Sequence, residues 1–229
     1  MILLSQRILG NDFWYKTLPV LVIGMMIWVI FTLLFSGFLG ASAISLSFTV
    51  IIISVVLYLL FWVLTIILAF MKKNLISMLS FFGASILTGV LSSTLLVWAS
   101  TIIRIDLVLG IFFAAFFVGI GATVGLLIMG LLLRGKISEK LIYPILLFGF
   151  LLLGIEVSLI LIFGYNPYIL ITSIFVLVWF FVVILWDGSR LPNIIEEGYW
   201  MVAVIDIFLD LVNVIIRIFI IIVELLSGE

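Results

Sequence analysis

Four polar residues lie inside the last hydrophobic segment of the chain, from Tyr199 to Leu226. They are Asp206, Asp210, Asn213 and Arg217, at offsets i, i+4, i+7 and i+11. On an α-helix these offsets place all four along one face. Each ionisable group within a membrane span costs at least ~2.5 kcal/mol on insertion scales, so such groups usually face a protein interior or a water-filled cavity and mark a functional path. This polar stripe is therefore the first candidate for chemistry.

A second acid, Asp187, ends the preceding hydrophobic segment, where it can meet the acidic part of the stripe. Two carboxylates held together at low dielectric do not readily both ionise, so Asp187 and an acid of the stripe, Asp206 or Asp210, are predicted to share one proton. With the proton present, the hydrogen-bonded pair closes the cytoplasmic end of a path. Without it the carboxylates repel each other, and their oxygens attract a hard cation such as Ca²⁺. The pair is thus predicted to sense pH, to act as a gate and to bind calcium transiently.

The other polar residues of the stripe are assigned supporting roles. At 1.5 Å per residue Arg217 lies about 27 Å along the last helix, near the depth expected for Glu156, and these two are predicted to form an ion pair. A buried pair neutralises itself, which favours a structural role. Asn213 with Asp210 either lines a pore or clamps neighbouring helices. Asp206 either adds to the pore lining or reaches back to cytoplasmic water.

Composition defines the class of protein. Of the 229 residues, 67% are hydrophobic and 9% are charged, and the mean hydropathy is +1.62. Soluble domains are about 45–50% apolar, so this is an integral membrane protein. The chain has neither cysteine nor histidine, which excludes thiol chemistry, a serine–histidine dyad and the usual imidazole metal ligands. A net charge of −1 spread along the chain gives no sign of nucleic-acid binding.

The hydrophobic pattern predicts an all-α bundle of seven transmembrane helices in a single domain that covers residues 1–229. A helix needs ~20 apolar residues to cross the hydrocarbon core, and strands of alternating polarity are not visible. The breaks between segments are short and carry charges, glycine or proline. The seven segments are roughly 17–39, 46–71, 75–99, 107–133, 141–163, 168–187 and 199–226.

The distribution of lysine and arginine predicts the orientation. Eight basic residues fall in the N-terminal tail and the alternate loops that share its side, against Arg104 alone on the other side. The positive-inside rule then puts the N-terminus in the cytoplasm and the C-terminus outside. We expect a multi-pass protein of the plasma membrane. The eight are Arg7, Lys16, Lys72, Lys73, Arg134, Lys136, Lys140 and Arg190.

Two segments near the C-terminus resemble a known family. The run Ile184-Leu185-Trp186-Asp187, a short polar loop, and then Leu209-Asp210-Leu211-Val212-Asn213 resembles the C-terminal signature of the Bax inhibitor-1 family, also called the transmembrane Bax inhibitor motif family. Trp186 stands where that family typically has tyrosine. The resemblance implies a seven-helix bundle that leaks Ca²⁺, gated by an aspartate pair at Asp187 and Asp210. It also implies a basic residue of the second helix nearby, for which Lys72 or Lys73 is the candidate.

The leading functional hypothesis is a pH-sensitive calcium leak channel without a bound cofactor, whose partners are the lipid bilayer, calcium ions and protons. A proton-coupled secondary transporter is the first alternative, since a buried acid pair also suits proton coupling. A non-conducting regulatory membrane protein is the second. An enzyme is not expected. An intramembrane aspartyl protease using Asp187 with Asp206 or Asp210 is disfavoured because the glycine-x-glycine-aspartate motif of such enzymes is missing.

Overall fold

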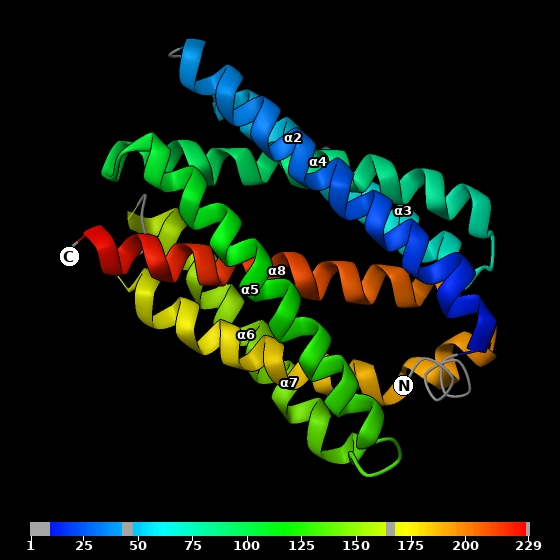
Figure 1. The fold of residues 1–229 in the computed structure, drawn as a ribbon. Helices are drawn as coiled ribbons and strands as arrows, with labels where there is room; N and C mark the ends of the chain where they lie inside the picture. The colour runs from blue at the N-terminus through cyan, green and yellow to red at the C-terminus, as the bar shows by residue number, and fades with distance from the viewer. Residues whose placement is uncertain (1–9, 43–47, 164–167, 228–229) are drawn as a thin grey trace. The chain divides into compact units, whose positions relative to one another are not determined.

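The computed structural model describes residues 10–42, 48–163 and 168–227, and within these ranges the chain is helical apart from short turns (Figure 1). A π-helical stretch, Phe13–Thr17, leads into the first of seven long α-helices. The predicted all-α architecture is confirmed, and each predicted segment corresponds to one helix. The helices are α2 (Leu18–Ser42), α3 (Phe48–Phe70), α4 (Asn74–Ile102), α5 (Ile105–Leu132), α6 (Glu139–Phe163), α7 (Ile169–Glu196) and α8 (Trp200–Ser227).

Four helical stretches of the described chain are long and apolar enough to span a membrane. The described apolar parts of α3 and α6 are shorter, and α8 carries Asp206, Asp210 and Arg217 within its apolar run. Four such stretches identify a multi-pass membrane protein, because an α-helix satisfies the hydrogen bonds of its own backbone within lipid. The four stretches are Gly10–Gly37, Asn74–Ile102, Ile105–Leu132 and Ile169–Glu196.

The sixth predicted segment ends later than the sequence suggested. A break at Asp187 is wrong, because α7 continues through this residue to Glu196. The helix is terminated instead by a turn at Gly198, whose φ is +85°. The N–H of Gly198 donates to the carbonyl of Ile195 at 2.9 Å, and the N–H of the next residue donates to Ile194 at 2.9 Å. This pair of bonds is the Schellman ending, which favours glycine at the residue with positive φ.

Gly188, read in the sequence as part of the break, instead allows α7 to approach α5. A methyl group added to Gly188 would lie 2.7 Å from the carbonyl oxygen of Leu127 on α5. One added to Gly130 of α5 would meet the carbonyl oxygen of Leu185 on α7. The two backbones therefore touch at a pair of glycines, as small residues permit in membrane helices. The contact lies next to Asp187 in the sequence and fixes this part of α7 against α5.

The chain divides into two compact units. The first comprises Met1–Ile102 and Pro192–Phe208, and the second comprises Ile103–Leu191 and Leu209–Glu229. The division passes through α7 and through α8, so each helix contributes to both units. Asp187, Asp210, Glu156 and Arg217 all belong to the second unit.

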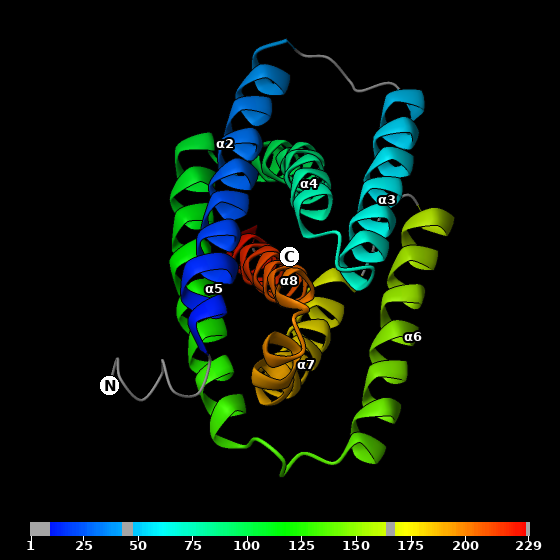
Figure 2. The same cartoon turned by 90° about the vertical axis from the view of Figure 1, so that its right-hand side faces the viewer.

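In the first unit, α4 packs against both α2 and α3 (Figure 2). Hydroxyl groups join the helices: Thr65 of α3 donates to the Ser80 hydroxyl of α4 at 2.8 Å, and the indole N–H of Trp28 on α2 donates to Ser92 of α4 at 3.0 Å. These side chains are buried. The first unit is thus held by neutral polar contacts and by an aromatic cluster of Trp62, Phe81 and Phe208.

In the second unit, a hydrophobic cluster forms around buried residues of α7. The indole N–H of Trp179 also donates to the carbonyl of Ile145 on α6 at 3.0 Å. Gly119 of α5 lies against Ile215 of α8, where an added methyl group would come within 2.5 Å of the Ile215 side chain. Core packing thus ties α5, α6 and α8 to α7 and holds their polar side chains in place. The buried members of the cluster around α7 are Val176, Trp179, Phe180, Ile184 and Val214.

Candidate functional site

Asp187 of α7 and Asp210 of α8 lie together in the second unit, with their carboxyl groups close enough for a side-chain hydrogen bond. Asp210 is 4% exposed, whereas Asp187 is partly exposed. A carboxylate can only accept hydrogen bonds, so a bond between two carboxyl groups needs a proton on one of them. The pair singled out in the sequence is thus brought together, in an arrangement whose bonding changes when a proton leaves.

Arg190 is a neighbour of this pair that the sequence analysis did not assign to it. Its charge acts on Asp187, three residues earlier on α7, and its guanidinium carbon lies 4.2 Å from the centre of the Trp186 ring. The i, i+3 spacing is the signal that was available, because such residues are adjacent on a helix. It was missed because the helix was expected to end at Asp187. Arg190 therefore places a positive charge beside the aspartate pair.

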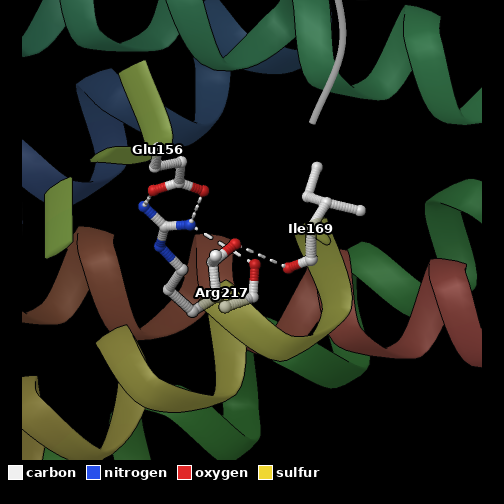
Figure 3. A network of polar contacts seen from close by, with 5 residues as sticks. Glu156, Ile169 and Arg217 are labelled. Carbon is white, nitrogen blue, oxygen red and sulfur yellow. Dashed lines mark hydrogen bonds and ion pairs between the residues drawn. The ribbon is translucent and has the colours of Figure 1, made fainter. Parts of the chain in front are cut away.

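The predicted ion pair between Glu156 of α6 and Arg217 of α8 is present in the structure (Figure 3). The Nη1 and Nη2 atoms of Arg217 donate to the two carboxylate oxygens of Glu156, each at 2.6 Å. Nη1 also donates to the Ser173 hydroxyl of α7 at 3.3 Å, a partner the sequence did not reveal. Glu156 is 6% exposed and Arg217 is 9% exposed. This forked pair is the strong, directional form of an arginine–carboxylate contact.

Asn213 and Asp206 have different surroundings along α8. The side-chain amide of Asn213 donates to the carbonyl of Leu209 on its own helix at 2.7 Å. This bond lies within α8, so it does not support the predicted clamp between helices. Asp206 is partly exposed and belongs to the part of α8 in the first unit. Both predicted roles for Asp206, in a pore lining or in contact with cytoplasmic water, stay predictions.

Lys72 contacts the turn between α7 and α8. It follows α3 with a φ of +56°, and its ammonium group donates to the carbonyl of Glu197 at 2.8 Å and lies 4.3 Å from the centre of the Tyr199 ring. Lys73 is exposed in the same turn. A positive charge at the end of a helix interacts favourably with its last carbonyls. The expected proximity of Lys72 or Lys73 to the aspartate pair stays a prediction.

The second unit therefore contains two polar centres, both of which include residues of α8. Asp210 and Arg217 are seven residues apart, which places them on one face of the helix about 10 Å apart along its axis. Among the residues that the structure describes, no group of three or more acidic side chains could hold a metal ion. The aspartate pair has two carboxyl groups, and transient cation binding by these two groups stays a prediction.

No protein-family model, curated protein or solved structure matches the chain.

Proposed function

We propose that the protein is a pH-sensitive leak channel for Ca²⁺, gated by Asp187 and Asp210. The observation that carries this proposal is the close approach of the two carboxyl groups, one on α7 and one on α8, within reach of a side-chain hydrogen bond. Buried ionisable groups on membrane helices are rare and usually mark ion or proton paths. A pair of acids on two neighbouring helices can control how closely those helices lie.

The direction of the pH response follows from the chemistry of the pair. With one proton bound, the carboxyl group of one aspartate donates to the carboxylate of the other, and the helices are held together. When the proton leaves, two negative charges face each other in a medium of low dielectric and repel. The path opens as the pH rises, and the freed oxygens offer the hard ligands that Ca²⁺ prefers.

The proposal includes a topology of seven spans, with the N-terminus in the cytoplasm, the C-terminus outside and the chain in the plasma membrane. Seven α-helices in the described chain support the number of spans, and the excess of basic residues on alternate loops supports the orientation. In this topology α8 begins on the cytoplasmic side, so the aspartate pair lies in the inner half of the membrane. The gate then responds mainly to cytoplasmic pH.

The resemblance to the Bax inhibitor-1 family supports the same function. It rests on Trp186-Asp187 and on the run from Leu209 to Asn213, and the two aspartates of these runs are the ones that the structure brings together. Membership of that family is part of the proposal.

Calcium flux into liposomes that contain the purified protein tests the gate, measured between about pH 6 and pH 8 on either side of neutrality. We expect flux in the parent to rise with pH, and Asp187→Asn and Asp210→Asn to flatten this dependence because an amide does not titrate in this range. Asp106→Asn is the matched control, since Asp106 is an exposed acid paired with Arg104 at 2.9 Å. It should behave as the parent does.

Two results would contradict the proposal. The first is the absence of flux at every pH from protein that elutes as a single folded species in size-exclusion chromatography. The second is flux that saturates and requires an opposing proton gradient, which would assign the pair to a proton-coupled transporter. A protein that acts only through partners would give the first result.

A further inference from the structure

The Glu156–Arg217 pair lies on the same face of α8 as the aspartate gate. It is buried between α6, α7 and α8, where Arg217 contacts Glu156 and Ser173 (Figure 3). Buried ion pairs often contribute no more stability than apolar residues of similar volume. Packing alone therefore does not account for a full positive and a full negative charge at this position.

Arg217 is incompletely hydrogen-bonded by the residues that the structure describes. Its Nη1 and Nη2 atoms donate to Glu156 and Ser173, but its Nε–H is buried and has no acceptor among the residues that the structure describes. A buried donor without an acceptor is costly, and ordered water is the usual partner when protein groups do not supply one. The Nε–H of Arg217 and the Ser173 hydroxyl form a small polar site that water can complete.

We infer that the Glu156–Arg217 pair, with Ser173, lines the same conduction path as the aspartate gate and sets its charge selectivity. This inference rests on the proposed channel function. While the pair is intact its charges cancel, so a cation passes a site of zero net charge. An arginine without its partner would repel a cation, and a glutamate without its partner would attract one. Loss of either partner thus has a predicted sign, and the two signs are opposite.

Thiol chemistry tests whether the pair is wet. The chain has no cysteine, so Ser173→Cys introduces a single thiol in a conservative substitution. We expect it to react with water-soluble methanethiosulfonate reagents in the reconstituted protein. Ser138→Cys, on an exposed loop, is the reactive control, and Ser85→Cys of the first unit is the unreactive control, because Ser85 and Ser173 are equally buried in the structure. Reaction at position 173 no faster than at position 85 would overturn the inference.

Charge selectivity is tested in the same background. With Ser173→Cys present, Arg217→Gln should raise the ratio of reaction rates for cationic over anionic reagents about tenfold, and Glu156→Gln should lower it by a similar factor. Calcium flux should move in the same two directions. If the rate ratio shifts in the same direction in both variants, or does not shift, the inference is overturned. The proposed gate still stands in that case if the parental protein conducts calcium. Parental protein without flux would overturn the gate itself. If a charge variant fails to fold, reactivity of the Ser173→Cys variant alone decides.

Discussion

The two polar centres of the second unit show how charge type decides what a buried pair can do. Asp187 and Asp210 carry the same charge, so their hydrogen bond exists only while a proton is shared. Glu156 and Arg217 carry opposite charges and hold each other through two bonds of 2.6 Å. In the proposed gate the aspartate pair is therefore conditional on pH, whereas the other pair is held by opposite charges.

Burial sharpens this difference. Both members of the ion pair are at least nine-tenths buried, whereas Asp187 remains partly exposed beside Asp210. A proton can thus leave the aspartate pair through Asp187. The lesson is that α8 combines a responsive contact and a fixed contact on one face. This comparison between the aspartate pair and the ion pair can be tested by substitutions that affect one pair and leave the other intact.

The largest effect is expected from removing one member of the ion pair. Arg217→Met leaves the Glu156 carboxylate buried without its partner, which should reduce the free energy of unfolding by about 3–5 kcal/mol. Chemical unfolding in detergent, followed by circular dichroism, measures the change. A loss below about 1 kcal/mol would show that the site relaxes or floods with water.

A smaller effect is expected when both charges are removed. Glu156→Gln combined with Arg217→Met leaves no uncompensated ion, so this double variant should be more stable than Arg217→Met alone by roughly 1–3 kcal/mol. A double-mutant cycle with both single variants measures the coupling. Additive losses would mean that the two side chains do not depend on each other, contrary to their short contacts.

Much of the fold and of both pairs could be predicted from the sequence. Long apolar runs separated by charged or glycine-containing breaks give helices, because each backbone group must be satisfied within its own segment. Glu156 and Arg217 could be matched by depth alone, because rise per residue is constant along a helix. Asp187 could be matched to the acidic part of α8 because the connection between their helices is short, and the resemblance to the Bax inhibitor-1 family selected Asp210 rather than Asp206.

What escaped prediction depends on contacts between helices. Gly188 looked like a helix break, but its role is set by Gly130 on another helix. Arg190 was counted as a loop charge because the helix was expected to end at Asp187, whereas α7 continues to Glu196. The Ser173 contact with Arg217 could not be foreseen, because hydroxyl-bearing residues are common in these helices and spacing does not say which of them faces a given neighbour.

The glycine contact gives a third way to separate the two centres. Gly188→Ala would place a methyl group 2.7 Å from the Leu127 carbonyl oxygen, and relief of this overlap should cost about 1–3 kcal/mol and displace Asp187. Gly121→Ala is the matched control on α5, since no atom lies within 4 Å of its added methyl group. We expect Gly188→Ala alone to alter the pH dependence of calcium flux. Equal behaviour of the two variants would separate the gate from this glycine contact.

The smallest change in stability is expected at the gate itself. Asp187→Asn keeps a side chain of the same shape that can donate to the Asp210 carboxylate, so the free energy of unfolding should change by about 1 kcal/mol or less. Unfolding in detergent at constant pH measures this change alongside Arg217→Met. A loss of 3 kcal/mol or more, the size expected for a broken buried ion pair, would mean that the Asp187 carboxylate is a fixed ionic partner. The contrast between a conditional pair and a fixed pair would then fail, and the pH response would need another source.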